Sequence, residues 1–211
     1  MSKKNYDVVI IGGGIVGLTI AYLISEKNKK LKLLIIDKEK KIGSHSSGRN
    51  SGVLHAGIYY KPETLKAKVS VKGAKVLKEW CHEECLPVLS CGKVISPQLE
   101  ELDPQLDLLL ERGRKNGAKV ELIDIKDFYK LVPDGRTSSG RALWSPNTCV
   151  VKPYLVLQRL KKILEERGVD FSLNSNIIKF SINQKCITLK RENICEDKFY
   201  GHLFNCAGLQ S

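Results

Sequence analysis

The sequence predicts an α/β fold whose parallel sheet is interrupted by an inserted α+β segment. Residues 7–11 (DVVII) form a continuous apolar, β-branched run, which is typical of a strand buried on both faces of a parallel sheet. Three glycines end this run, apolar residues at helical spacing follow over 15–27, and residues 31–36 form a second strand-like run. This order is that of a right-handed βαβ unit. The middle of the chain has irregular spacing and strands of its own, which indicates a separate unit.

The later elements are expected in the following order. Pro62 stands where the first position of a helix over 63–84 is expected, and further helices are predicted at 98–116, 125–131 and 153–167. Strands are predicted at 91–96, 118–123, 169–173, 177–182, 186–190 and 198–205, with an extended segment over 141–151. We therefore expect a discontinuous first domain, residues 1–86 and 149–211, and a partial inserted domain over residues 87–148.

Length and composition exclude several classes of protein. The 211 residues carry a net charge of +12, but the lysines are spread along the chain, so we expect no nucleic-acid partner. No apolar run approaches the roughly 18 residues of a membrane span. The amino-terminal segment has no apolar region of the kind found in signal peptides. We expect a cytoplasmic protein, with loose attachment to the inner face of a membrane as the alternative that the positive charge leaves open.

The strongest motif is the glycine turn after the first strand. Gly12, Gly14 and Gly17 form GxGxxG between a buried strand and a helix. In this context the glycines allow a tight turn, close backbone approach to a diphosphate and close helix–strand packing. Asp37 ends the next strand, where an acid accepts hydrogen bonds from a ribose hydroxyl. The pattern predicts a Rossmann-like dinucleotide-binding domain, and a merely structural glycine turn is the alternative.

A second informative segment is 46–60, SSGRNSGVLHAGIYY, in which small residues alternate with polar ones. Such a segment can bring many N–H and O–H donors against a flat polar ring system and its phosphates. A plain Ser/Gly loop has the same composition, so the residues alone leave both readings open.

Taken together, these segments resemble a known family. GGGIVGLTIA, the acid at the end of the second strand, NSGVLHAGIYY with KPETLKAK, CGKVIS and the closing FNCAGLQS are similar to FAD-dependent oxidoreductases of the D-amino-acid-oxidase superfamily. Within it the resemblance is strongest to the L-2-hydroxyglutarate dehydrogenase/oxidase family. It covers all 211 residues but only about the front half of such an enzyme. It implies a Rossmann-like FAD/NAD(P)-binding domain with an inserted, incomplete α+β substrate domain, and FAD as the cofactor.

The resemblance also implies a set of cofactor-binding positions in this sequence. They fall at the glycine turn, the strand-terminal acid, the Ser/Gly segment, a later strand that meets the adenine and the closing segment over the diphosphate. These positions are Gly12, Gly14, Ile15, Gly17, Asp37, Lys38, Ser47, Gly48, Asn50, Ser51, Gly52, Ile177, Ile178, Cys206, Ala207 and Gly208. Two positions depart from the family's pattern: Asp37 replaces the more usual Glu, and Arg49 stands where several relatives have His.

His55 and Arg49 are the candidates for catalysis. Oxidation of a 2-hydroxy acid removes a hydroxyl proton, and a histidine that titrates near neutral pH suits the role of base. A structural histidine beside the flavin is the equal alternative. Arg49 suits bidentate binding of a substrate carboxylate, and pairing with a flavin phosphate or a surface acid is the alternative. Tyr59 and Tyr60 either donate hydroxyls toward the pocket or pack against the sheet.

The cysteines do not predict a metal site. Cys81, His82, Cys85 and Cys91 lack the paired spacing of zinc ligands, so we expect packed thiols and no bound metal. Cys206 is expected to be a small buried residue rather than a nucleophile.

The function expected from the resemblance is oxidation of L-2-hydroxyglutarate or a similar 2-hydroxy acid to the 2-oxo acid, with oxygen or a membrane quinone as electron acceptor. An amino-acid or amine oxidase of the same superfamily is one alternative. A catalytically silent fragment that binds FAD is the other, since a half-covered flavin site cannot exclude water.

Overall fold

The structure is a computed structural model and describes residues 4–210. The chain divides into two compact units, residues 1–50 with 153–211 and residues 51–152. The second unit therefore begins at 51 and ends at 152, where the sequence led us to expect 87 and 148. Strand pairing explains the difference, because β8 (Cys149–Val151) pairs with both β3 (Val53–Leu54) and β4 (Val88–Leu89) and so joins the segment before residue 87 to this unit.

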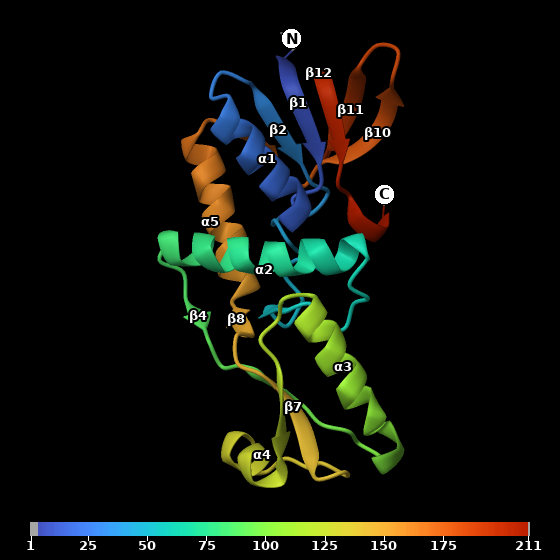
Figure 1. The fold of residues 1–211 in the computed structure, drawn as a ribbon. Coiled ribbons are helices and arrows are strands. Elements are labelled where there is room, and N and C mark those ends of the chain that lie inside the picture. Colours follow the sequence, from blue (N-terminus) through green and yellow to red (C-terminus); the bar gives the residue numbers. More distant parts are fainter. Residues whose placement is uncertain (1–3, 211) are drawn as a thin grey trace. The chain divides into compact units, whose positions relative to one another are not determined.

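The first unit contains a six-stranded sheet in the order β10-β11-β12-β1-β2-β9 (Figure 1). Its central strand β1 (Lys4–Ile11) pairs in parallel with β2 (Leu33–Ile36) and with β12 (Ile194–Asn205), and β2 pairs in parallel with β9 (Asp170–Ser172). The strands β10 (Asn176–Ser181) and β11 (Cys186–Arg191) form an antiparallel extension on β12. The predicted parallel sheet is thus confirmed for four strands and not for this hairpin.

The register of the parallel strands brings three chain segments to one edge of the sheet. Ile11 is paired with Ile36 on one side and with Asn205 on the other. Each of these residues ends its strand, so the residues that follow emerge side by side at the carboxyl edge. Ligands of open α/β sheets bind at this edge.

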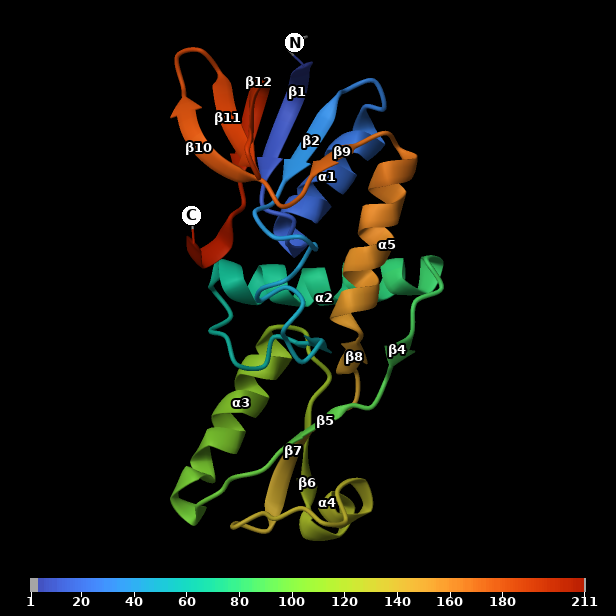
Figure 2. The same cartoon turned by 180° about the vertical axis from the view of Figure 1, so that it is seen from behind.

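Helices α1 (Ile15–Lys27) and α5 (Pro153–Glu166) pack against each other, and α1 also packs on β1 and β2 (Figure 2). All four residues of β2 are buried, as expected for a strand covered on both faces. The apolar side chains of β1, β2 and β11 form the core of this unit, with Tyr6, Val9, Leu34, Ile36, Ile187 and Leu189 at its centre.

The second unit holds two three-stranded antiparallel sheets, β3-β8-β4 and β5-β7-β6. The strands of the latter are β5 (Lys93–Ile95), β6 (Glu121–Asp124) and β7 (Arg141–Ser145), and the helices are α2 (Leu65–Glu83), α3 (Pro104–Lys115) and α4 (Ile125–Leu131). Its core contains Ile58, Leu106, Val120 and Leu143. Arg141 of β7 forms hydrogen bonds with Asp103 (Nε to Oδ1, 2.8 Å) and with Asp107, and these bonds hold the start of α3 to the sheet.

Two helix predictions are wrong at their starts. The helix expected over 98–116 is a single 3₁₀ turn, η1 (Glu100–Leu102), followed by α3, because Pro104 lacks the N–H of a helix interior and instead begins a new helix. Pro62 does not occupy the first position of α2; the helix begins at Leu65, and the Thr64 hydroxyl accepts a hydrogen bond from the Ala67 N–H (3.2 Å). Among the described residues, no helix has the length and apolar character required to cross a membrane.

Candidate functional site

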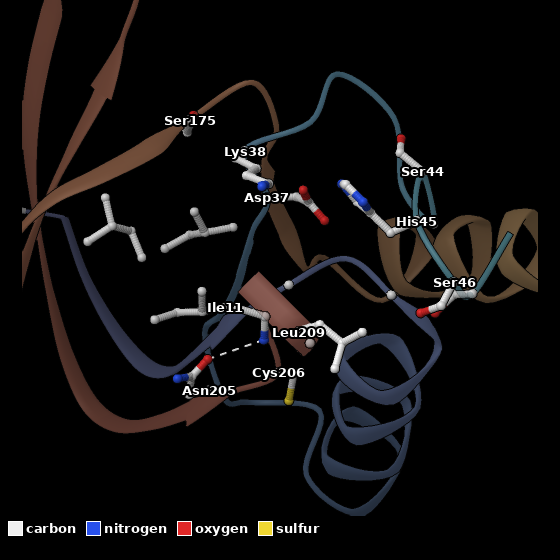
Figure 3. A pocket seen from close by; sticks show the side chains of 18 of the residues that line it. Ile11, Asp37, Lys38, Ser44, His45, Ser46, Ser175, Asn205, Cys206 and Leu209 are labelled. Atoms are coloured by element: carbon white, nitrogen blue, oxygen red, sulfur yellow. Dashed lines mark hydrogen bonds between the residues drawn. The ribbon is translucent and has the colours of Figure 1, made fainter. Parts of the chain in front are cut away.

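A cavity of about 700 Å³ lies at the carboxyl edge of the sheet in the first unit (Figure 3). The segments that follow β1, β2 and β12 line it, together with the turn before β10 and the loop over 43–49. The predicted cofactor residues that line it are Gly12, Gly14, Asp37, Lys38, Ser47, Ile177, Cys206, Ala207 and Gly208, and the candidate substrate residue Arg49 joins them.

Two of the three motif glycines, Gly12 and Gly17, leave no room for larger residues. Gly12 has φ +108°, and a Cβ there would lie 2.3 Å from the carbonyl oxygen of Cys206. A Cβ on Gly17 would lie 2.1 Å from the carbonyl oxygen of Gly12, so this glycine permits close packing of α1 on the turn. At Gly14 a Cβ would meet only the side chain of Ser47, with the Oγ at 2.9 Å and the Cβ at 3.9 Å. Gly12 and Gly17 therefore maintain the fold, while Gly14 keeps the amino-terminal end of α1 open.

The amino terminus of α1 lies at the cavity, because its cap residue Gly14 is part of the lining. Gly14 caps the helix without a side chain, and the first turn contains no acidic residue. The Ile15 N–H donates to the Ser47 hydroxyl (3.0 Å). Unpaired amides and the helix dipole favour a negative charge at this position.

Asp37 holds the glycine turn as well as lining the cavity. Its Oδ2 accepts a hydrogen bond from the Gly13 N–H (2.7 Å), and its Oδ1 accepts one from the Glu39 N–H (2.9 Å). A carboxylate has about four acceptor positions, so two remain for a ligand. The hydrogen bond from the glycine turn thus fixes the orientation of the Asp37 carboxylate, and both are expected to contact the same ligand.

The loop over 43–50 is held by its own hydrogen bonds. The Asn50 side-chain amide donates to the carbonyl oxygens of Ser46 (3.1 Å) and Ser47 (2.9 Å), and the Gly48 N–H donates to the His45 carbonyl (3.1 Å). Asn50 and Gly48 do not line the cavity, and neither do Ile15, Gly17 and Ile178. Ser51 and Gly52 belong to the second unit.

The candidate base His55 lies in the second unit, beside Tyr59 and Lys93. The rings of His55 and Tyr59 are edge to face, with centroids 6.3 Å apart, and the Lys93 Nζ lies 4.4 Å from the Tyr59 centroid. Partial loss of hydration lowers the pKa of His55, and the positive charge of Lys93 lowers this pKa further. His55 therefore favours the neutral form that can accept a proton.

The sequence profile of the family described as FAD dependent oxidoreductase (DAO) matches residues 7–211. The chain belongs to this family. It is 37% identical to the mitochondrial L-2-hydroxyglutarate dehydrogenase of Caenorhabditis briggsae, over 98% of this chain and 48% of that protein. For the L-2-hydroxyglutarate dehydrogenase of Indibacter alkaliphilus the identity is 34%, over 98% of this chain and 51% of that protein. The chain thus spans about half the length of these curated relatives.

Solved structures show the same fold. An L-α-glycerophosphate oxidase from Mycoplasma pneumoniae with FAD bound has a TM-score of 0.81 at 23% identity, over 95% of this chain and 53% of that one. A glycine oxidase from Geobacillus kaustophilus has a TM-score of 0.86 at 15% identity, over 99% of this chain and 56% of that one. The α/β fold of FAD-binding DAO-type oxidases, predicted from the sequence, is confirmed, and FAD is the cofactor of this family.

The residues around the cavity fit the adenine dinucleotide part of FAD. The diphosphate would lie at the amino terminus of α1, where Gly14 leaves space and the helix contributes donors. Asp37 retains acceptor positions for a ribose, and Ile177 adds an apolar side chain to the lining. Arg49 also lines this cavity, which agrees with its alternative role of pairing with a phosphate.

Sequence reasoning missed several residues that line the DAO-family cavity. They include Ser44, His45 and Ser46 on the loop, Ser175 and Asn176 at the start of β10, and Asn205 and Leu209 around the end of β12. His45 Nε2 lies 2.9 Å from Glu39 Oε1. The Asn205 Oδ1 accepts a hydrogen bond from the Ala207 N–H (3.2 Å; Figure 3). Two signals were available in the sequence: Ser46 belongs to the Ser/Gly segment 46–60, and Asn205 lies at the carboxyl end of a predicted strand.

The expected packing of the cysteines is found at Cys81 and not at Cys85 and Cys91. In the part of the chain that the structure describes, no three side chains of the metal-binding types gather into a site. Cys81 is buried while Cys85 and Cys91 are exposed. Burial raises the pKa of the Cys206 thiol, which disfavours the nucleophilic thiolate.

Proposed function

We propose that this chain contributes the cofactor-binding part of an FAD-dependent dehydrogenase or oxidase that converts L-2-hydroxyglutarate, or a similar 2-hydroxy acid, into the 2-oxo acid. The cavity at the carboxyl edge of the sheet, with its glycine turn and Asp37, is the observation that supports cofactor binding. The relatives named L-2-hydroxyglutarate dehydrogenase support the substrate class.

His55 serves as the base in this proposal. Its neutral imidazole takes the proton of the substrate hydroxyl, and the pKa lowered by partial desolvation and by Lys93 keeps it neutral before the substrate binds. FAD held by the glycine turn and Asp37 would supply the oxidising chemistry, as the acceptor of the hydride from C2 of the substrate. The hydroxyl O–H and C2–H bonds break, two electrons leave with the hydride, and a C=O bond forms.

The glycine turn and Asp37 orient the cofactor rather than react. The α1 amino terminus would stabilise the diphosphate, and the Asp37 carboxylate would accept hydrogen bonds from the ribose. Arg49 fits a phosphate contact in the same cavity.

The test uses the purified 211-residue chain with added FAD. We expect the chain to retain FAD through gel filtration, and L-2-hydroxyglutarate to bleach the bound flavin in the absence of oxygen. A chain that stays colourless would contradict the proposal at the level of the cofactor. Bleaching by glycine or a D-amino acid, and not by the hydroxy acid, would instead indicate an amine oxidase. Bound flavin that no substrate reduces would indicate a silent fragment.

The electron acceptor is tested separately. Oxygen uptake during turnover would indicate an oxidase. Reduction of a soluble quinone analogue, without oxygen uptake, would indicate a dehydrogenase that passes electrons to a membrane quinone.

A further inference from the structure

Lys93 is a half-buried cation of the second unit. It lies on β5, where its backbone pairs with Ser145 of β7. Its ammonium group contacts the face of the Tyr59 ring at 4.4 Å from the centroid. Within residues 4–210 no carboxylate lies at ion-pair distance from it, whereas Lys115, Lys130 and Lys161 each pair with a neighbouring acid on their own helix.

The Tyr59 ring also brings Lys93 next to His55. The rings of His55 and Tyr59 form an edge-to-face pair, with an angle of 74° between their planes and centroids 6.3 Å apart. The charge of Lys93 is felt at the imidazole, since it is one of the two causes that lower the pKa of His55. The second unit therefore groups the positive charge of Lys93 and the imidazole of His55 around the ring of Tyr59.

This group matches the chemistry of a 2-hydroxy acid. The hydroxyl that loses its proton is on the carbon next to a carboxylate, so a base that reaches the hydroxyl has a negative charge nearby. A cation beside the base can bind that charge and hold the hydroxyl in place. The other candidate for this role, Arg49, lines the nucleotide cavity of the first unit and fits a phosphate there.

We propose that Lys93 binds a carboxylate of the 2-hydroxy acid and thereby places the substrate hydroxyl at His55, with Tyr59 orienting the ammonium group. This inference rests on the proposed function. It adds a determinant of specificity: the site requires an acidic substrate, and neutral alcohols lack the group that Lys93 binds. The bound carboxylate offsets the charge of Lys93, so His55 accepts the proton more readily once substrate is present.

The experiment measures carboxylate binding directly, with glutarate as an unreactive probe and glutaramide as its neutral counterpart. The ring signals of His55 are followed by NMR in the intact chain, with saturating FAD and again without FAD, over a pH series. We expect glutarate to raise the pKa of His55 and glutaramide to leave it unchanged. In the Lys93→Gln chain the pKa of His55 should be higher at the outset and should no longer respond to glutarate.

Matched variants separate binding from folding. Loss of a charge-assisted hydrogen bond weakens affinity by about tenfold or more, so we expect this change in the Kd for glutarate in Lys93→Gln and recovery in Lys93→Arg. Lys66→Gln is the control, because Lys66 lies over Tyr60 as Lys93 lies over Tyr59 (4.7 Å from the centroid) and is not among the causes of the His55 shift. Circular dichroism reports whether each variant is folded.

The outcomes distinguish this inference from the function on which it rests. The role of Lys93 would be overturned if the parent chain and folded Lys93→Gln had the same Kd for glutarate. It would also be overturned if glutarate left the pKa of His55 unchanged both with and without FAD. Failure to bind FAD would overturn the proposed function whatever glutarate does.

Discussion

Replacing Gly14 with alanine removes the space at the start of α1 while leaving the fold in place. Gly14 has φ −84° and ψ 179°, which any residue adopts, so alanine introduces no backbone strain. The added Cβ would lie 2.9 Å from the Ser47 Oγ and 3.9 Å from the Ser47 Cβ, so a shift of the Ser47 Oγ by a few tenths of an ångström relieves the contact and only lengthens the 3.0 Å hydrogen bond that it accepts from the Ile15 N–H. Alanine is a poorer helix cap than glycine by about 1 kcal/mol. The free energy of unfolding should fall by no more than about this amount.

The affinity for FAD should fall much further. The new methyl group would stand between the helix amides and a diphosphate, and would prevent at least one charge-assisted hydrogen bond. Such a bond contributes about 1.5–3 kcal/mol, which corresponds to a Kd about 10- to 100-fold higher. Quenching of flavin fluorescence during titration with the chain gives the Kd, and urea denaturation of the same sample gives the stability.

Two further glycine variants act as controls. Gly73 is an exposed residue within α2 with no heavy atom within 4 Å of a new Cβ, so Gly73→Ala should stabilise the chain by about 0.5–1 kcal/mol and leave the Kd unchanged. Gly12→Ala combines a positive φ with a 2.3 Å clash against the Cys206 carbonyl and should disrupt the first unit. A folded Gly14→Ala chain that binds FAD as tightly as the parent would refute a diphosphate site at this helix terminus.

Three other predictions concern the titratable groups and the acid of the cavity. Asp37→Asn presents an amide N–H₂ to one of two backbone donors, Gly13 or Glu39, so urea denaturation should show a loss of about 1–3 kcal/mol even without FAD. The pKa of His55 is lowered in the folded chain, so the unfolded chain binds more protons as the pH falls from about 6.5 towards the folded pKa. The free energy of unfolding, measured by urea denaturation over a pH series, should therefore decrease as the pH falls through this interval. The His55→Gln variant should lack this decrease. Because burial raises the pKa of the Cys206 thiol, iodoacetamide should alkylate Cys206 more slowly than the exposed cysteines at neutral pH. Mass spectrometry of the peptides would show the order of alkylation. Alkylation of Cys206 before the exposed cysteines would contradict this prediction.

The glycine turn and Asp37 could be predicted because local spacing determines them. A strand, a glycine-rich turn, a helix and a second strand that ends in an acid must bring the turn and the acid to one edge of a parallel sheet. The structure has this arrangement, with Ile11 and Ile36 paired at the strand ends. The sequence did not reveal that Asp37 binds the Gly13 N–H, because any acid at this position gives the same pattern.

Contacts between distant segments were less predictable. Asn205 reaches the cavity because β12 pairs with β1, and a strand pattern does not specify its partner. The antiparallel direction of β10 and β11 was missed for the same reason. The grouping of Lys93 with Tyr59 depends on the packing of β5 beside the segment after β3, where no motif marks the lysine.

In the proposed site, Asp37 would link recognition of the sugar to the shape of the glycine turn. One carboxylate oxygen fixes the Gly13 N–H, in the same turn whose next residue, Gly14, begins the proposed diphosphate site. Loss of that oxygen should therefore weaken FAD binding in two ways, through the ribose contact and through a looser turn, and should also lower stability. Gly14→Ala should weaken binding with little loss of stability. If the two variants were instead to lower FAD affinity only in proportion to their effects on stability, the cavity would be a consequence of packing and not a cofactor site.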